Sequence, residues 1–365
     1  MSKQGAALGA RLRERDLSAA PAALNLLESS TESDREQARA LLEEVSPATL
    51  GGEARGHIVG VTGPPGAGKS TLLSALLHAW RGAAREAGGQ GKTVAMLAVD
   101  PSSRRSGGSL LGDRARIEFD PKDKGVLIRS TAAGDRLGGL ASATRAAAQA
   151  LAAAFDVVVI ETVGVGQAET EVAEVADTVV VVVQPGSGDV LQFLKSGIME
   201  TPDVLVVTKA DLGQIALASR RDLSAALRSL GDGGERPTRV LSVSSLPPAQ
   251  GIEELVTALE EHREGIDVVA RRAQARRAGA LLDFTRENGE RGLRALGGRR
   301  AAERLLESTH TEIDEHMLVA FLAHAVEQGP IWTAAVSAKA EDPPPDAPAD
   351  EAPKTPISRE QSERS

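Results

Sequence analysis

A glycine-rich segment of this chain has the spacing of a phosphate-binding loop. Residues 63–70 read Gly-Pro-Pro-Gly-Ala-Gly-Lys-Ser, which fits the pattern G-x-x-x-x-G-K-S/T. The glycines let the backbone turn so that successive N–H groups face an anion. We therefore predict a nucleoside triphosphate site made by the residues Gly63, Pro64, Pro65, Gly66, Ala67, Gly68, Lys69, Ser70 and Thr71.

The flanking sequence agrees with this prediction. The apolar run Ile58–Val61 precedes the loop, and the helix-like run Thr71–Leu77 follows it. The N-terminus of a helix carries a partial positive charge that favours phosphate. Lys69 is the residue type that contacts the β- and γ-phosphates, and the hydroxyl of Ser70 is expected to ligate Mg²⁺.

Two other apolar runs end in a carboxylate. Residues 156–160 lead into Glu161 and then Gly164, and residues 94–99 lead into Asp100. In a phosphate-loop enzyme such a carboxylate lies near Mg²⁺, and the glycine amide senses the γ-phosphate. We predict that Glu161 and Asp100 serve the metal and that Gly164 contacts the γ-phosphate. Asp100 either holds metal-bound water or orients the attacking water.

Three more residues have alternative interpretations. Asp113 is either a second carboxylate near the metal or half of a capping and surface pair with Arg114. Lys195 either reaches the γ-phosphate or a partner, or is simply solvated. Gln167 is the second candidate, after Asp100, for positioning the attacking water.

A later segment indicates which base is bound. Thr208-Lys209-Ala210-Asp211 follows an apolar run. A carboxylate at Asp211 accepts from N1–H and N2–H₂ of guanine, whereas adenine would leave it unpaired at a cost of about 1–3 kcal/mol. The stem of Lys209 is expected to cover the base, and Ser244 and Ser245 to place a backbone N–H near guanine O6. Because Thr208 stands where the commonest form of this motif has Asn, the strictness of base selection stays open.

The elements that must position these residues alternate between short β-branched runs and helical stretches. Several runs are apolar on both faces, as in a parallel sheet covered by helices. We therefore predict an α/β fold with a doubly wound, mainly parallel sheet. The expected strands are His57–Val61, Thr93–Val99, Val126–Arg129, Val157–Ile160, Thr178–Val183, Val204–Val207 and Arg239–Val243.

Changes in sequence texture divide the chain into four expected parts. Residues 1–50 form an N-terminal helical extension, and residues 51–266 form the nucleotide-binding domain. From about residue 267 only helical patterns remain, with a basic patch at 271–277, so residues 267–335 are predicted to form a helical arm for dimerisation. Residues 336–365 are rich in proline and acids and are predicted to be a disordered tail.

Composition excludes several other classes of function. The formal net charge is −9, and aromatic residues make up 2% of the chain, which argues against nucleic acid as a partner. The chain has no cysteine, which excludes thiolate metal sites and cysteine nucleophiles. No apolar run is long enough to cross a membrane and no signal peptide is evident, so we expect a cytoplasmic protein that has no membrane partner.

Taken together, these motifs resemble the MeaB/ArgK family of P-loop GTPases, over about residues 20–330. The run Glu161-Thr162-Val163-Gly164-Val165-Gly166-Gln167 is the most discriminating part of the resemblance. The other matching stretches are 63–71, 99–103, 107–114, 184–189 and 208–211. Ser245 differs from the alanine that is usual in the family's last guanine loop.

The resemblance implies a GTP- and GDP-binding, Mg²⁺-dependent chaperone of an adenosylcobalamin-dependent acyl-CoA mutase, most often methylmalonyl-CoA mutase. Such proteins gate cofactor loading, protect the mutase and form homodimers through a C-terminal arm. By similarity, Lys69, Ser70, Asp100, Asp113 and Glu161 serve phosphate and Mg²⁺. The segment 184–195 resembles the family's additional switch, which places Lys195 near the nucleotide.

Two alternative functions belong to other classes. One is an ATP-dependent kinase or ATPase linked to basic amino-acid transport, a label attached to the ArgK branch; Asp211 argues against its ATP preference. The other is a nickel-insertion GTPase, which the absence of cysteine and of a histidine-rich tract disfavours.

Overall fold

The computed structural model describes the chain as far as residue 329, with gaps. The described residues are 3–29, 31–86, 91–100, 117–132, 142–162, 168–186, 202–229 and 237–329. The predicted tail at 336–365 lies outside them. The part of the chain that the structure describes includes no helix long and apolar enough to cross a membrane.

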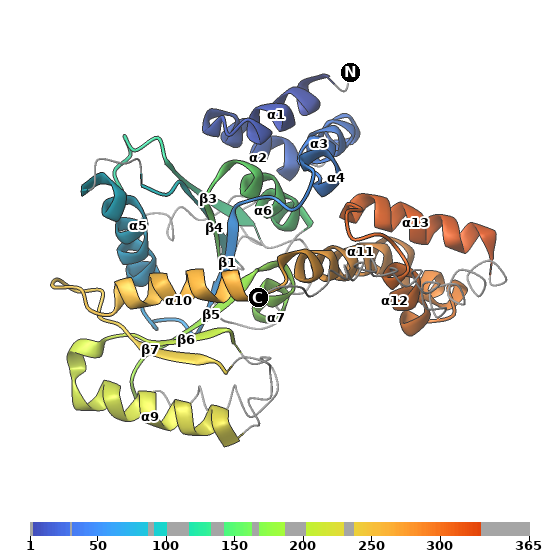
Figure 1. The fold of residues 1–365 in the computed structure, drawn as a ribbon. Coiled ribbons are helices and arrows are strands. Elements are labelled where there is room, and N and C mark those ends of the chain that lie inside the picture. Colours follow the sequence, from blue (N-terminus) through green and yellow to red (C-terminus); the bar gives the residue numbers. More distant parts are fainter. Residues whose placement is uncertain are drawn as a thin grey trace, which may run out of the picture.

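One seven-stranded sheet organises the molecule (Figure 1), and its strand order is β3-β2-β4-β1-β5-β6-β7. Every pair of neighbouring strands is parallel, so the predicted fold class is confirmed. The strands are β1 His57–Thr62, β2 Val94–Asp100, β3 Val126–Ala132, β4 Val157–Thr162, β5 Thr178–Val183, β6 Val204–Val207 and β7 Arg239–Ser242.

Both faces of the sheet are apolar and covered by helices, which is why its strands read as continuous hydrophobic runs. On one face Val59 and Val61 pack in a core with α5 (Lys69–Glu86) and α10 (Ile252–Gly265). The core of the other face contains residues of three helices. These helices are α6 (Ser142–Ala154), α7 (Ala168–Val175) and α9 (Gln214–Ser229).

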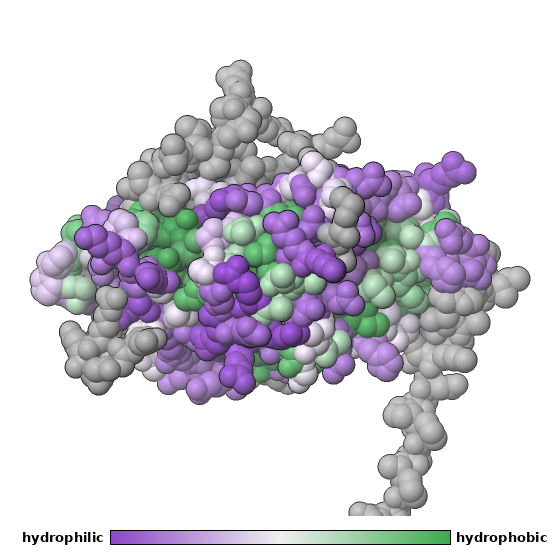
Figure 2. Space-filling view, turned by 90° about the horizontal axis from the view of Figure 1, so that it is seen from above, coloured by the Kyte–Doolittle hydropathy of each residue, from purple (hydrophilic) through white to green (hydrophobic). Residues whose placement is uncertain are grey.

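The N-terminal helices share the core of that second face. Leu12, Leu24 and Leu41 are buried in the same cluster as Leu151 of α6, and Figure 1 shows these helices above α6. The N-terminal elements are α1 (Lys3–Arg13), the 3₁₀ turn η1 (Leu17–Ala19), α2 (Ala20–Glu28), α3 (Glu32–Glu44) and α4 (Pro47–Leu50). Seen from this side, hydrophilic and hydrophobic residues are interspersed over the described surface (Figure 2).

The C-terminal helices have a core of their own. Phe284, Leu305 and Leu322 are fully buried in it. The helices are α11 (Val268–Ala295), α12 (Arg299–Glu307) and α13 (Glu315–Gln328). α11 bends at Gly289, which has φ 62°, a left-handed conformation that glycine adopts without strain. These helices project to one side of the sheet (Figure 1).

An aspartate precedes each of three strands at the amino-terminal edge of the sheet, and each one fixes a neighbouring segment. Asp156 accepts from Thr93 N at 2.8 Å. Asp177 accepts from Ile58 N at 2.9 Å. Asp203 likewise accepts from the backbone N of the second residue of β5 at 2.8 Å. These carboxylates therefore satisfy backbone donors that no preceding strand residue can satisfy.

Arginines from the two helical extensions pair with the same aspartates. Arg15, which follows α1, lies 2.5 Å from Asp156. Arg272 of α11 lies 2.6 Å from Asp177, which is fully buried. Burial alone would raise the pKa of Asp177, but the charge and hydrogen bonds of Arg272 lower it below its usual value. Part of the basic patch at 271–277 is therefore buried against the sheet domain.

α1 and α3 cross at a very short distance. A Cβ atom on Gly5 would lie 1.9 Å from the carbonyl oxygen of Gln37, and one on Gly9 would lie 2.5 Å from that of Leu41. Residues four apart share one face of a helix, so this pair of glycines forms the contact surface of α1.

We expect Gly5→Ala to lower the free energy of unfolding by about 1–3 kcal/mol, because α3 must move away to accommodate a methyl group. Urea denaturation measures the change. Gly82→Ala in α5 is the matched control, because its Cβ atom would meet nothing within 4 Å and alanine is favoured over glycine in a helix by about 1 kcal/mol. Equal gains in stability from both substitutions would contradict the packing described for α1.

Candidate functional site

The described residues of the predicted site gather at the carboxyl edge of the sheet. Because all strands are parallel, the carboxyl ends of β4, β1, β5, β6 and β7 lie side by side along this edge. The phosphate loop follows β1, the carboxylate Glu161 lies near the end of β4, and Thr208 follows β6. Ligands of open α/β sheets bind at this edge.

The phosphate loop depends on glycine at defined positions. Gly63, Gly66 and Gly68 have φ angles of 142°, 77° and 91°, in the region that favours glycine. A Cβ atom on Gly63 would also lie 2.0 Å from the carbonyl oxygen of Val182 in β5. The loop can therefore pass against the neighbouring strand only without a side chain at this position.

Lys69 and Ser70 open α5 directly after the loop. Lys69 is 7% exposed, and its Nζ donates to Gly63 O at 2.7 Å and to Pro64 O at 3.3 Å. The ammonium group thus lies inside the curve of the loop, where a helix N-terminus adds partial positive charge. This arrangement fits a triphosphate.

Two strands bring acidic residues to the same edge. Glu161 of β4 pairs in register with Val61 of β1 and with Ala98 of β2, and it is 7% exposed. Asp100 is the last residue of β2 and pairs with Ala132 of β3. Glu161 therefore lies one strand away from the base of the phosphate loop, and the backbone of Asp100 lies two strands away.

Thr208 connects the base-recognition segment to the phosphate loop. Its side chain is buried, and Oγ1 lies 2.6 Å from Ala67 O and 3.0 Å from Val183 O. A hydroxyl group donates one hydrogen, so the shorter contact, to Ala67, is the natural acceptor. The threonine that replaces asparagine in this motif thus holds two parts of the site together across a long stretch of sequence.

Lys209 and Asp211 are both exposed on the next turn. Lys209 has a positive φ of 54°, and its Nζ donates to Gln184 Oε1, just beyond β5, at 2.7 Å. Asp211 lies in the 3₁₀ turn η3 (Ala210–Leu212). Ser244 Oγ donates to Asp211 Oδ1 at 2.9 Å, so one carboxylate oxygen is fixed while the other stays available for a base.

The loop after β7 is itself held in place. Ser244 is buried and forms a two-way backbone bridge with Gln250, with distances of 3.0 Å and 2.9 Å. Ala210 N also donates to Val243 O at 3.0 Å. Ser245 follows directly, so the predicted guanine loop lies beside Asp211. Sequence reasoning missed the roles of Ser244 and Gln184 in orienting other side chains, since no local pattern links either one to its partner.

Four residues of the predicted site lie outside the described residues. They are Gly164, Gln167, Lys195 and Asp113. Their roles stay predictions, as does the role of the Asp100 side chain.

The residues around the loop fit Mg²⁺. The hydroxyl of Ser70 and the carboxylate of Glu161 are hard oxygen donors, which this ion prefers, and Mg²⁺ usually takes only one or two protein ligands beside phosphate and water. The described residues include no group of three or more His, Cys, Asp and Glu side chains that could hold a metal by themselves.

A comparison with known families agrees with this geometry. The family described as methylmalonyl Co-A mutase-associated GTPase MeaB matches residues 20–291. The chain belongs to this family of GTPases. It is 43% identical over 251 residues to a Pyrococcus abyssi protein named as a GTPase, with 67% of this chain and 73% of that protein covered.

Two further comparisons bear on this GTPase. It is 37% identical over 251 residues to the mouse protein named methylmalonic aciduria type A homolog, mitochondrial, and the match covers 66% of this chain and 58% of that protein. A crystal structure of a LAO/AO transport system kinase superposes with a TM-score of 0.59 and 26% identity, covering 89% of this chain and 98% of that one. The prediction of the MeaB/ArgK family is confirmed.

We expect Thr208→Val to weaken the binding of GTP and ATP by the same factor, because the lost hydroxyl holds the phosphate loop and not the base. Leaving the buried Ala67 carbonyl without its donor should also cost about 1–3 kcal/mol of stability. Calorimetric titration with both nucleotides and urea denaturation measure these effects. Thr208→Ser keeps the hydroxyl and serves as the control. A change in the GTP-to-ATP affinity ratio in Thr208→Val would instead assign Thr208 to base recognition.

Proposed function

We propose that this GTPase is a chaperone of an adenosylcobalamin-dependent acyl-CoA mutase, such as methylmalonyl-CoA mutase, and that it gates cofactor loading and protects the mutase. The family description, which names association with methylmalonyl-CoA mutase, supports the partner. The name of the mouse relative refers to methylmalonic aciduria, and it also supports a partner that acts on a methylmalonyl compound.

The nucleotide preference within this proposal rests on Asp211. Its carboxylate is held by Ser244 at 2.9 Å, and Ala210 is tied to the end of β7. A carboxylate fixed in this way is matched to the paired donors of guanine, and a base without them leaves the charge unsatisfied. We therefore assign GTP and GDP as the ligands.

Hydrolysis in this proposal is an in-line attack of water on the γ-phosphate. Lys69 neutralises the charge that develops on the phosphate oxygens, together with the backbone N–H groups of the loop. Ser70 and Glu161 are the described residues that would hold Mg²⁺, directly or through water, with Asp100 and Asp113 as further predicted contributors. Bound Mg²⁺ supplies additional charge stabilisation and orients the phosphates.

The proposed dimer uses the C-terminal helices. They form a core of their own that is distinct from the two cores of the sheet domain, so α11, α12 and α13 can act as an arm. Met317 on α13 is 55% exposed and offers an apolar side chain to a second copy. This arrangement agrees with the homodimer that the family resemblance implies.

An ATP-dependent kinase linked to basic amino-acid transport is the second candidate function. The likeness to the LAO/AO transport system kinase structure favours it. The position of Asp211 disfavours it, because adenine has no paired donors to offer that carboxylate.

We expect Asp211→Asn to weaken GTP binding by at least about tenfold and to leave ATP binding unchanged, because only guanine uses the carboxylate. The same variant should gain affinity for xanthosine triphosphate, whose carbonyl at position 2 can accept from the new amide. Titration of the wild type and the variant with the three nucleotides measures this. Tighter binding of ATP than of GTP by the wild type would favour the transport kinase.

The chaperone role is tested with a purified acyl-CoA mutase. We expect the GTPase to form a complex with the mutase, and transfer of adenosylcobalamin into the apo-mutase to depend on whether GTP, GDP or a non-hydrolysable GTP analogue is bound. Gel filtration and the cobalamin absorption spectrum follow the two steps. Lys69→Ala, which removes the phosphate-binding ammonium, is expected to abolish the nucleotide dependence. Loading that proceeds identically with every nucleotide would refute the gating role.

A further inference from the structure

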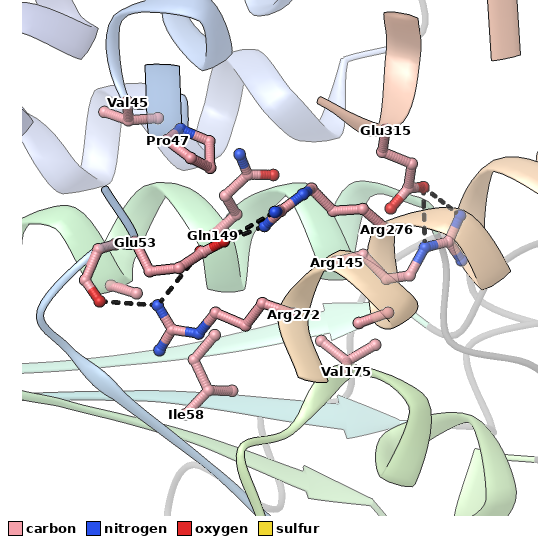
Figure 3. A pocket seen from close by; sticks show the side chains of 13 residues that line it. Val45, Pro47, Glu53, Ile58, Arg145, Gln149, Val175, Arg272, Arg276 and Glu315 are labelled. Atoms are coloured by element: carbon pink, nitrogen blue, oxygen red, sulfur yellow. Dashed lines mark hydrogen bonds and ion pairs between the residues drawn. The ribbon is translucent and has the colours of Figure 1, made fainter. Parts of the chain in front are cut away.

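A small cavity marks the junction between the sheet domain and the C-terminal helices (Figure 3). Its volume is about 50 Å³, which is enough for water. Charged side chains from four segments line it: Arg145 of α6, Glu53 of the loop before β1, and residues of α11 and α13. They lie among apolar side chains such as Val45, Ile58 and Val175, so charged groups are enclosed at this junction.

One arginine at this junction faces two carboxyl groups. Arg145 Nη2 lies 2.7 Å from Glu315 Oε1 at the start of α13 and 2.8 Å from Asp283 Oδ2 of α11. Arg145 Nε also donates to Glu315 Oε1 at 3.0 Å. The side chains of Arg145, Asp283 and Glu315 are 6%, 16% and 19% exposed. Three elements thus meet at one mostly buried charge cluster.

A glycine on α11 makes room for this arrangement. A Cβ atom on Gly279 would lie 2.4 Å from Glu315 Oε2. The carboxyl group of Glu315 therefore lies directly against the α11 backbone, with Arg145 on its other side. A Cβ atom at position 279 would displace the carboxyl group of Glu315 from this place.

The charges in this cluster do not balance if both carboxyl groups are ionised. Burial raises the pKa of Glu315 to about 7; Arg145 opposes this rise, and the charge and hydrogen bond of Asp283 add to it. With a proton on Glu315, Arg145 faces one anion, and the carboxyl group of Glu315 can donate to Asp283 and so join α11 to α13. Without that proton, two carboxylates face Arg145. Arg286 lies 3.3 Å from Asp283 but is 55% exposed, so the buried charge on Glu315 is poorly compensated, which is costly.

Other charged groups face the cluster from every neighbouring element. Asp314 precedes Glu315 and accepts from Gln149 of α6 at 3.0 Å; burial is the main reason that its pKa is raised to about 6. Further groups are Arg286 beside Asp283, Arg272, Arg276 and Glu53 around the cavity, and Glu43 of α3 near Asp314. His316 directly follows Glu315, and burial and the charge of Arg39 lower its pKa. Arg272 and Arg276 are paired with Asp177 and Glu53, so they do not compensate Glu315.

We propose that Glu315, protonated and directed at Asp283, forms with Arg145 a proton-dependent clamp that holds the C-terminal helices against the nucleotide-binding domain. The clamp is tight when Glu315 carries its proton and weaker when Glu315 has lost it. Because α13 belongs to the proposed dimerisation arm, the clamp sets how firmly that arm is fixed to the sheet domain.

The direction of the pH dependence follows from the two pKa values of Glu315. When α13 separates from α6, Glu315 returns to its ordinary pKa of 4.5 and releases its proton. Docking therefore binds a proton between pH 4.5 and about 7, and it weakens as the pH rises through that window. Between pH 6 and pH 8 the docking equilibrium should fall by about tenfold.

Hydrogen exchange of the full-length protein tests the clamp. We expect the protection factors of the α13 amides, corrected for intrinsic exchange, to fall by about tenfold from pH 6 to pH 8. Glu315→Gln keeps a neutral donor toward Asp283 and should show the same high protection at both pH values. Asp283→Asn also removes the second carboxylate and provides an independent variant if Glu315→Gln does not fold.

Two matched variants separate Glu315 from its neighbours. Asp314→Asn removes the other raised carboxyl group, and Glu312→Gln removes an exposed acid just before α13; both should keep the pH dependence of the wild type. A wild type with constant protection, a persistent pH effect in Glu315→Gln, or loss of the effect in Asp314→Asn would each overturn the proposal.

Discussion

Seven strands run parallel in one sheet, and this arrangement places all their carboxyl ends along a single edge. The phosphate loop, the carboxylate of Glu161 and the base-recognition segment follow different strands, yet they converge because those strands are neighbours in the sheet. The central strands β1, β4 and β5 are buried along their whole length, so the edge is anchored in the core. The nucleotide site is therefore assembled by strand order, and contacts such as Thr208 with Ala67 then join its parts.

The amino-terminal edge of the sheet holds the helical extensions. There the aspartates that precede β4, β5 and β6 satisfy backbone donors and also pair with arginines. Arg15 and Arg272 use these aspartates to fix the N-terminal and C-terminal helices to the sheet. The pair of Arg272 with Asp177 is buried; such a pair adds little net stability, but breaking it leaves an uncompensated charge. The relative position of the helical extensions is thereby fixed by charge as well as by packing.

The predicted nucleotide site and the attachment of the helical extensions lie at opposite edges of the sheet. The predicted nucleotide contacts lie at the carboxyl ends, while the junction with α11 and α13 lies near the amino ends of the strands, around Asp177 and Glu53. Between them, α7 follows β4 and ends shortly before Asp177.

Local sequence patterns determined the strands, the phosphate loop and the family, because alternating apolar runs and glycine spacing act over a few residues. All seven expected strands occur within a few residues of their predicted bounds. The tertiary structure alone decided that Thr208 reaches a loop 141 residues away and that the basic patch is partly buried against residues 95 positions earlier. Those pairings follow from the distances that folding creates between side chains, and no short pattern encodes such distances.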